Sequence, residues 1–251
     1  MAGFMKVKRL LSKIDELQKQ INDKRPLDKE HLKSLRGYYR VGLTWASNAL
    51  EGNTLTESET KIVIEDGLTI NGKPLRDHLE ASGHADAFDF MHTLVQKKEI
   101  TENDLLSFHR YFYKKIDESN AGIYRNVQVF VSGSKYPVTP PEKIRSEMER
   151  VLKMLSGCRG NEHPVAAAAK AHKDFVFIHP FIDGNGRVAR LLMNLVLLQE
   201  GYTIAVIPPV KRAEYIQSLE EAHTNDTKFV ELVCSVVYET QKDYLRMLKG
   251  N

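Results

Sequence analysis

The segment from His179 to Arg190, "HPFIDGNGRVAR", restricts the possible folds of this chain more than any other feature. Gly184 and Gly186 allow a tight turn in which successive backbone N–H groups point inward. The run that follows, "RVARLLMNLVLLQE", is apolar on nearly every side and is typical of a central, buried helix. Because a helix adds the positive end of its dipole at its N-terminus, the segment predicts an anion cradle at the start of a buried helix.

The polar residues of this segment fit the binding of a magnesium nucleotide. Asp183 lies at the lip of the cradle, and magnesium is usually held by one or two carboxylates together with the phosphates of its substrate. Arg187 and Arg190 are three positions apart, so both guanidinium groups can lie on one helix face and hold a polyphosphate. Histidine titrates near neutrality, so His179 suits the removal of a proton from an attacking hydroxyl. We therefore expect group transfer from a magnesium nucleotide to a hydroxyl.

Each of these features has a simpler interpretation when it is considered alone. A single histidine before Pro-Phe is usually a packed residue, Gly-Asn-Gly is usually a turn, and two arginines at this spacing usually lie on a solvated face. Their coincidence on one loop before an apolar helix favours a functional site. The pattern is neither GxGxxG after a strand nor GxxxxGK[ST], so it does not indicate dinucleotide binding or P-loop chemistry.

The segment matches the Fic-family motif HxFx(D/E)GNGRxxR at every specified position, and by this motif the chain resembles that family. A second stretch, "GIYRNVQVFVSG" from Gly122, resembles the GxYR segment and the hairpin flap of Fic proteins. The resemblance implies an all-α, Fic-fold helical bundle with a small β-hairpin flap and an N-terminal helical extension. It also implies a protein adenylyltransferase, which transfers AMP from ATP to a Ser, Thr or Tyr hydroxyl of a target protein.

The resemblance assigns a role to each residue of the motif. His179 would be the general base, Asp183 would hold Mg²⁺, and Arg190 would reach the γ-phosphate of ATP. The residues that would bind the phosphates are Gly184, Asn185, Gly186 and Arg187. In the Doc branch of the family, which phosphorylates its targets, a lysine replaces the second glycine of GNG. This chain keeps Gly186, which favours AMP transfer.

A second resemblance lies in "SNALEGN", which fits the family's inhibitory-helix motif (S/T)xxxE(G/N) and places that helix at about residues 44–52. Glu51 falls at the end of a helix, where the macrodipole disfavours a carboxylate by up to about 1 kcal/mol. A cation would offset this cost. The resemblance implies that Arg190 is the cation, with Ser47 and Glu51 as inhibitory residues. The alternative is a solvated Glu51 beside a glycine cap.

Hydrophobic periodicity predicts helices along most of the chain. We expect an N-terminal helical region at 1–95 that carries the inhibitory helix, a Fic core at 96–215, and C-terminal helices at 216–251. A narrow apolar stripe near the N-terminus consists of Leu10, Ile14, Leu17 and Ile21. We expect this stripe to pack against the rest of the chain, with a homodimer seam as the alternative.

Two stretches predict β-hairpins. "LTINGKPL" is expected to turn at Asn71-Gly72, and "NVQVFVSGSKYPV" alternates and turns at Ser132-Gly133. The flap hairpin at 127–138 is expected to receive the target protein as an added strand, which uses backbone hydrogen bonds and needs little target sequence. The alternative is a hairpin that only covers the loop. Tyr215, in "AEYIQSLEEA", is expected near the base.

Composition excludes several classes of function. The net charge is +3 over 251 residues without a long basic run, so nucleic-acid binding is not indicated. The N-terminus reaches charged residues too soon for a signal peptide, and the longest apolar run is too short for a bilayer, so we expect a cytoplasmic protein without membrane contact. Cys158 and Cys234 lack CxxC spacing or a nearby histidine, and we expect buried thiols rather than a disulfide or a zinc site.

Two other functions stay open. A protein-AMP hydrolase, or a bifunctional enzyme, would keep the nucleotide site and use Glu51 to position water, since some relatives with an inhibitory glutamate remove AMP. A non-catalytic nucleotide-binding interaction module or a DNA-binding module is disfavoured, because the sequence has no helix-turn-helix signal or basic stripe.

Overall fold

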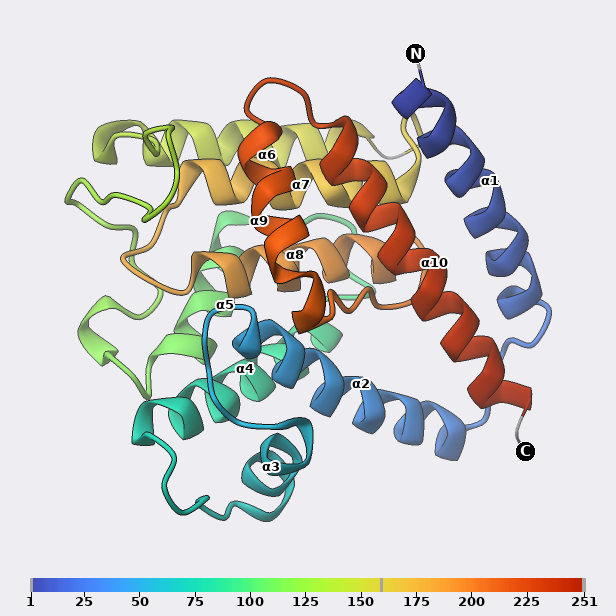
Figure 1. The fold of residues 1–251 in the computed structure, drawn as a ribbon, viewed down its shortest axis with the longest axis horizontal. Coiled ribbons are helices and arrows are strands. Elements are labelled where there is room, and N and C mark those ends of the chain that lie inside the picture. Colours follow the sequence, from blue (N-terminus) through green and yellow to red (C-terminus); the bar gives the residue numbers. More distant parts are fainter. Residues whose placement is uncertain (1, 159, 250–251) are drawn as a thin grey trace.

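The computed structural model of the chain describes residues 2–158 and 160–249, and over these residues the fold is helical without a β-strand (Figure 1). The all-α class predicted from the sequence is confirmed. The α-helices are α1 (Ala2–Asn22), α2 (Lys29–Ala49), α3 (Glu57–Lys61), α4 (Leu75–Thr93), α5 (Glu102–Tyr113), α6 (Ile144–Cys158), α7 (Pro164–Ile178), α8 (Asn185–Gln199), α9 (Arg212–Glu221) and α10 (Thr227–Lys249). Shorter elements are the π-helix η1 (Ile62–Asp66) and the 3₁₀-helices η2 (Glu118–Asn120), η3 (Pro141–Lys143) and η4 (Pro209–Lys211). None of the helices in these two ranges is long and apolar enough to cross a bilayer.

Helix α8 lies at the centre of the molecule, as its sequence predicts. Every side chain from Arg187 to Leu197 is buried. In Figure 1, α7 runs alongside α8, and α2 and α4 approach it from the other side. The N-terminus of α8 is therefore within reach of segments from both the N-terminal and the C-terminal parts of the chain.

Local sequence signals explain where several helices begin and end. The Asp28 side chain caps the first turn of α2, and Thr101 and Asp104 form a reciprocal capping box at α5. Pro164 opens α7, where the missing N–H costs no hydrogen bond. After α2, Gly52 adopts a φ of 96°, the left-handed conformation expected for the chain reversal at "EGN".

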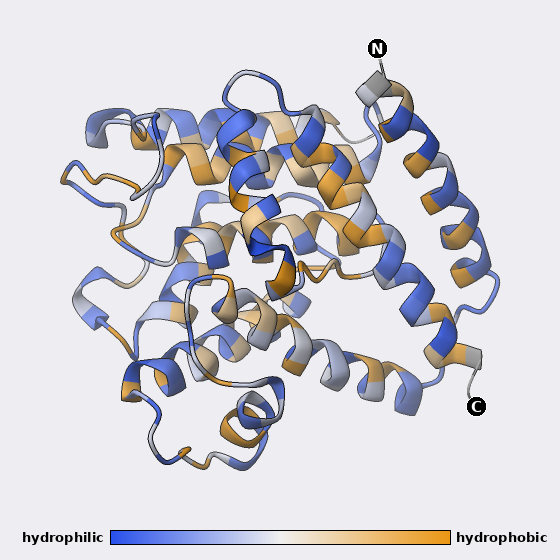
Figure 2. Ribbon diagram, in the orientation of Figure 1, coloured by the Kyte–Doolittle hydropathy of each residue, from blue (hydrophilic) through white to orange (hydrophobic). Residues whose placement is uncertain are grey.

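The apolar stripe of α1 is used within the chain. Helix α1 packs against α10, as Figure 1 shows. Ile14 and Ile21 are fully buried at this contact, and Leu10 and Leu17 pack against the same core. Figure 2 shows that hydrophilic and hydrophobic residues alternate along α1. The stripe therefore contributes intramolecular packing, as expected, and a homodimer would need another surface.

The structure shows neither of the two predicted β-hairpins. Residues 68–74 form a loop with a turn at Asn71-Gly72, and the preceding π-helix was not foreseen from the sequence. A hairpin with only two strands is marginal on its own. In this loop the N–H of Ile70 donates to the His78 side chain at 2.8 Å, so a side chain takes the place of a strand partner.

The segment at 127–138 turns at Ser132-Gly133 as predicted, but it remains a loop without strand pairing. Its backbone groups bond to side chains instead. Arg125 donates to the carbonyl groups of Val127 and Thr139. Glu220 accepts the N–H of Lys135 at 2.7 Å. The alternating sequence therefore gives an extended loop that is held by two charged side chains.

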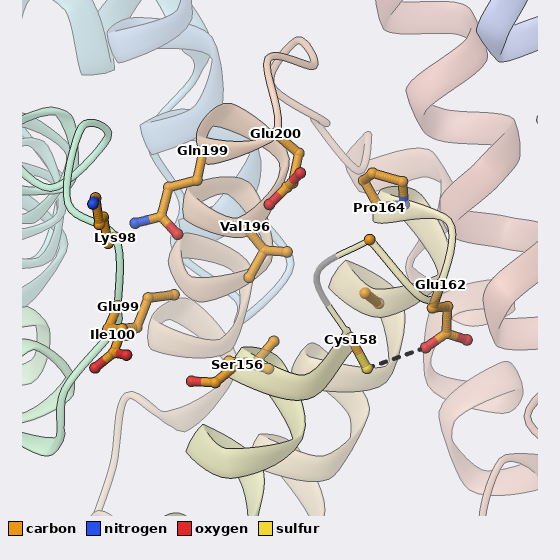
Figure 3. Close-up of a pocket in the computed structure, with 13 residues that line it drawn as sticks. Lys98, Glu99, Ile100, Ser156, Cys158, Glu162, Pro164, Val196, Gln199 and Glu200 are labelled. Atoms are coloured by element: carbon orange, nitrogen blue, oxygen red, sulfur yellow. Dashed lines mark hydrogen bonds between the residues drawn. The ribbon is translucent and has the colours of Figure 1, made fainter.

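The two cysteines differ in exposure. Cys234 is buried in α10, as expected, whereas Cys158 at the end of α6 is only partly buried. Figure 3 shows Cys158 at a small pocket beside Glu162, whose carboxylate accepts a hydrogen bond from the thiol at 3.4 Å. Burial and the neighbouring carboxylate raise the pKa of the Cys158 thiol, so this cysteine is a weak nucleophile.

Candidate active site

His179 ends α7 and begins the loop of the motif. Its φ is 53°, a left-handed backbone that turns the chain out of α7. The imidazole Nδ1 lies 3.3 Å from the carbonyl oxygen of Val176. Because a carbonyl only accepts, Nδ1 carries the proton and Nε2 is left as an acceptor. Burial lowers the pKa of His179 below its ordinary value, so the ring is neutral and can take a proton at neutral pH.

The loop between α7 and α8 is closed by Asn185. Its side-chain amide donates to the carbonyl of Phe181 at 2.8 Å and accepts the N–H of Phe181 at 2.9 Å. Gly184 has a φ of 80°, and a Cβ at this position would lie 2.7 Å from the ring of Phe112, so only glycine fits. The Asn185 side chain is used within the loop, which leaves backbone N–H groups at the start of α8 for an anion.

His109, on α5, contacts the same loop. Its Nε2 donates to the carbonyl of Asp183 at 3.1 Å, and its Nδ1 accepts the N–H of Gly122 at 2.9 Å. The ring stacks on Phe181 with centroids 3.9 Å apart. Burial lowers the pKa of His109 to about 4, so the ring is neutral and both nitrogens are satisfied. His109 thus fixes the position of the loop relative to α5.

Asp183, the expected metal ligand, lies between two arginines. Its Oδ2 accepts from Nη2 of Arg76 at 2.5 Å, and its Oδ1 accepts from Nη2 of Arg187 at 3.3 Å. The N–H of Gly184 also donates to Oδ1, at 2.6 Å. Nη1 of Arg187 lies 3.3 Å from Oε1 of Glu80 on α4. The negative charge of Asp183 is therefore offset by the two arginines.

Arg190 is buried, with 1% of the residue exposed, and bonds to the end of α2. Its Nε donates to Oγ of Ser47 at 2.9 Å, and its Nη2 donates to the Ser47 carbonyl at 2.9 Å. Nη2 also donates to Oε1 of Glu51 at 2.7 Å. The Ser47 carbonyl belongs to the last turn of α2, where a cation is favourable. Arg187 contacts α4 and Arg190 contacts α2, so the two arginines tie α8 to different N-terminal helices.

Tyr215 holds Arg190 from the opposite side. Its hydroxyl accepts from Nη1 of Arg190 at 3.1 Å and lies 3.0 Å from Nε2 of His172. Burial and the charge of Arg190 keep the pKa of His172 well below its ordinary value, so His172 is neutral. The Tyr215 proton is then donated to Nε2, and the protonated Nδ1 of His172 has no partner within residues 2–158 and 160–249. The Tyr215 hydroxyl therefore bonds to Arg190 and His172, while Tyr215 and His179 line the same pocket.

The carboxylate of Glu51 lies at the N-terminus of α8. A Cβ at Gly186 would be 2.2 Å from Oε1 of Glu51, so the glycine leaves the room that the carboxylate occupies. Burial raises the pKa of Glu51, but three arginines outweigh this effect and hold the pKa below its ordinary value; they are Arg190, Arg187 and Arg212. The side chain is still 36% exposed. An anion of the protein thus occupies the expected anion cradle.

A pocket of about 250 Å³ adjoins His179, Glu51 and Gly186. One wall is the loop at 131–138, and α9 provides another. The ring of Tyr136 stacks on His223 with centroids 4.0 Å apart, and His223 stacks on Phe177 at 3.6 Å. These aromatic rings give the pocket a surface that suits a flat ring. No motif in the sequence indicates these three rings.

Arg125 connects the loop at 127–138 to the base. Its guanidinium has no carboxylate partner in the described ranges and donates only to carbonyl groups, including those of His179 at 2.7 Å and Val127 at 2.8 Å. Because Arg125 is buried, these carbonyls would lose their partner without it. The arginine of the GxYR segment is therefore a structural clamp behind the base.

We expect Arg125→Ala to lower the free energy of unfolding by about 2–3 kcal/mol, because several buried carbonyls would be left unsatisfied. Urea denaturation of both proteins measures this loss. The matched control is Arg150→Ala, which removes an exposed arginine paired with Glu147 and should change stability by less than about 1 kcal/mol. Equal small losses in the two variants would contradict the clamp role.

Comparisons with known proteins agree with this geometry. A model of the Fic/DOC family matches residues 99–197. The solved structure of Fic-1 (aa 134–508) from C. elegans superposes with a TM-score of 0.88 and 31% sequence identity, covering 97% of this chain and 73% of that chain. The chain belongs to the Fic family. Residues 99–197 lie within the core expected at 96–215, and the region boundaries themselves stay a prediction.

Two further Fic relatives have similar coverage of this chain. A Fic domain containing signaling protein from Bacteroides thetaiotaomicron superposes with a TM-score of 0.85 and 28% identity, covering 98% of each chain. The protein adenylyltransferase Fic of Drosophila grimshawi is 38% identical over 211 residues, which are 83% of this chain and 42% of that protein. The chain thus spans about two fifths of the length of this curated relative.

The structure brings the expected Fic-site residues together. The loop from His179 to Arg190 meets Ser47 and Glu51 at one place, although more than a hundred residues separate them. Three contributors were not foreseen, and they are Arg76, His109 and His172. Each of these residues lies on a helix that the sequence predicts. No local motif distinguishes the residue from an ordinary packed or solvated side chain. Only the contact between distant helices reveals them.

Proposed function

We propose that the chain transfers AMP from ATP to a Ser, Thr or Tyr hydroxyl of a target protein. The observation that carries this proposal is the neutral His179, with its Nε2 acceptor beside the pocket and the N-terminus of α8. Membership of the Fic family and the name of the Drosophila relative, a protein adenylyltransferase, support the same reaction.

In the proposed reaction, the target hydroxyl oxygen attacks the α-phosphorus of ATP, and the bond from that phosphorus to the pyrophosphate oxygen breaks. His179 takes the hydroxyl proton at Nε2, and the electron pair of the broken bond leaves with pyrophosphate. The backbone N–H groups at the start of α8 would bind the phosphates. The aromatic surface formed by Tyr136, His223 and Phe177 would contact the adenine.

The residues present fit one magnesium ion held jointly with the nucleotide. Asp183 offers one carboxylate at the lip of the loop, and its side chain is 38% exposed. Magnesium is commonly held by one or two carboxylates together with substrate phosphates and water. A bound ion would offset the negative charge of the phosphates. Asp183 would be its protein ligand.

We expect Asp183→Ala to weaken binding of magnesium-ATP far more than binding of ATP in EDTA, because the proposed role of the carboxylate is to hold the ion. Calorimetric titration of a non-hydrolysable ATP analogue measures both affinities. Asp174→Ala is a matched control, since Asp174 is a partly buried carboxylate on α7 paired with Lys173. Equal losses with and without magnesium would instead assign Asp183 a structural role.

The proposal places the target protein at the loop formed by residues 127–138. Phe130 is 88% exposed there, and the neighbouring Val127 is also exposed. The loop forms a wall of the pocket next to the base, so a target segment lying along it would present its hydroxyl to His179. Strand-like addition would use the extended backbone of the loop and would require little sequence from the target.

In the same proposal, the resting enzyme is autoinhibited by Glu51. Its carboxylate occupies the cradle at Gly186 and engages Arg190, which is the proposed partner of the γ-phosphate. ATP can bind productively only when the carboxylate leaves. Ser47 contributes by holding Arg190 against the end of α2.

AMP removal is the second candidate, because Glu51 and His179 line the same pocket. A carboxylate at that position could orient water toward AMP attached to a target. Incubation of an AMP-modified target with the protein and magnesium would release AMP under this alternative and would release none under simple transfer.

The main proposal is tested with ATP labelled on the α-phosphate. Label should appear on the protein itself or on a partner in a lysate, and mass spectrometry of the labelled band identifies the hydroxyl. Label that arrives from the γ-phosphate but not from the α-phosphate would indicate a kinase-like reaction and would overturn the assignment.

A further inference from the structure

The two oxygens of the Asp183 carboxylate have different environments. Oδ1 accepts the N–H of Gly184 and faces Arg187, so it is engaged by the loop and by the first turn of α8. Oδ2 has one partner among the described residues, Nη2 of Arg76 at 2.5 Å. The oxygen that could accept a metal ion without breaking the loop is therefore the one that Arg76 holds.

Arg76 reaches this oxygen from outside the loop. It is the second residue of α4 and precedes the family match at 99–197. Its Nε donates to Oε1 of Glu80 at 3.1 Å, so one guanidinium bridges Glu80 and Asp183. The Arg76 side chain is 55% exposed. Because it is long and half in solvent, it can leave Asp183 without disturbing the helix.

The charge of Arg76 matters because Asp183 stands beside an anion site. A bare carboxylate there would repel the phosphates of a nucleotide that arrives without a metal. Arg76 offsets this charge when no metal is present. A magnesium ion would offset the same charge, and both cations would use Oδ2. Because both cations would approach the same oxygen, they repel each other, and each weakens the binding of the other.

We propose that Arg76 is a built-in substitute for the metal at Asp183, and that it competes with magnesium for Oδ2. Arg76 supports metal-free nucleotide binding and raises the magnesium concentration needed for metal-dependent binding. It is a positioning residue, since it acts through Asp183. The inference rests on the proposed function only in taking Asp183 as the protein ligand of the ion.

The test is the ratio between the affinity for a non-hydrolysable ATP analogue with magnesium and its affinity in EDTA, measured by calorimetry on the full chain. Arg76→Ala should raise this ratio by about two- to five-fold, the range expected for an exposed ion pair. Affinity in EDTA should fall, and the half-saturating magnesium concentration should also fall. Arg76→Lys keeps the charge but cannot bridge Glu80 and Asp183. Its affinity ratio should lie between those of wild type and Arg76→Ala.

Controls separate this role from a general effect. Arg36→Ala removes a half-exposed arginine that pairs with Asp89 away from the site, and it should leave the ratio unchanged. In an Asp183→Asn background, Arg76→Ala should no longer change the ratio, as a thermodynamic cycle requires for coupled residues. An unchanged ratio in Arg76→Ala alone, or equal losses with and without magnesium, would overturn the proposal.

The same measurements distinguish failure of this inference from failure of the proposed metal site. If Asp183→Asn abolishes the magnesium dependence and Arg76→Ala leaves the ratio unchanged, only the role of Arg76 is wrong. If Asp183→Asn leaves the magnesium dependence intact, the assignment of Asp183 is wrong, and the competition falls with it. Neither result depends on AMP transfer, because the analogue does not react.

Discussion

Replacement of His179 by alanine is expected to lower the rate of AMP transfer by about 10²–10⁴-fold, which is the usual contribution of a general base. Nucleotide affinity should change little. The only hydrogen bond of the His179 side chain within the described ranges joins Nδ1 to Val176, so the ring does not hold the cradle in place. Nε2 is left to handle the proton. The substitution should therefore lower the rate of the chemical step and leave nucleotide binding nearly unchanged.

The measurement compares transfer from α-labelled ATP with binding of a non-hydrolysable analogue. His179→Asn is the matched variant, because asparagine tolerates the left-handed backbone at this position but cannot act as a base near neutrality. It should lose as much activity as His179→Ala. If the asparagine variant keeps its activity, or if affinity falls as far as the rate, His179 is not the base.

The pH profile gives an independent measure of the same role. Burial lowers the pKa of His179 below its ordinary value of 6.5, so the neutral, proton-accepting ring persists to lower pH. The rate should therefore be constant near neutrality and should fall only when the pH drops below 6.5 and the ring becomes protonated. This acid limb should be missing from the residual activity of His179→Ala.

The cradle was predictable because its determinants are local. His179, Asp183 and the two glycines lie within a few residues of one another, and the apolar run after them could only be a central helix. The stripe of α1 followed from the same reasoning, since four apolar residues at helical spacing require a partner surface. In both cases spacing along the chain determines which side chains share a face.

The residues that complete the site were not predictable in this way. Arg76 and His109 bond to the loop from α4 and α5, and His172 bonds from α7 to Tyr215, which contacts Arg190. A buried histidine that bonds to a carbonyl resembles any other histidine in a sequence. At the flap, by contrast, a local pattern predicted a structure that does not form. Its alternating residues predicted strands, but Arg125 and Glu220 take hydrogen bonds that a strand partner would otherwise make.

Replacement of Glu51 by glycine is expected to activate the enzyme. Oε1 of the wild-type carboxylate lies 2.2 Å from the position that a Cβ of Gly186 would take, and it bonds to Arg190 at 2.7 Å. A nucleotide must therefore displace Glu51 both from the N-terminus of α8 and from the arginine proposed to bind the γ-phosphate. Glycine at position 51 leaves the N-terminus of α8 and the Arg190 guanidinium free for the nucleotide. Activity should rise because the productive pose no longer competes with a protein anion.

The size of the effect follows from the contact that must be broken. A hydrogen bond between charged groups contributes about 1.5–3 kcal/mol. Because 36% of the Glu51 side chain is exposed, the lower end of that range applies. About 1.5 kcal/mol corresponds to a gain of roughly tenfold in the population that binds ATP productively. Loss of the bulky carboxylate from the cradle adds to this gain.

Stability should change little in Glu51→Gly. Arg190 keeps its hydrogen bonds to Ser47 and Tyr215, so the buried cation is not left without partners. The C-terminal end of α2 is also relieved of an unfavourable negative charge. Thermal unfolding of the two proteins without nucleotide should therefore give similar midpoints. A large loss of stability would mean that Glu51 is mainly a structural residue.

The decisive assay compares AMP transfer by wild type, Glu51→Gly, Arg190→Ala and the double variant at equal concentration. Arg190→Ala should be slow whether or not Glu51 is present, because the proposed γ-phosphate partner is lost in both. Activation should therefore appear only when Arg190 is intact. If Glu51→Gly is no faster than wild type, the carboxylate does not restrain the enzyme. If Glu51→Gly still activates the Arg190→Ala protein, inhibition acts through the cradle at Gly186 alone, and the competition for Arg190 is wrong.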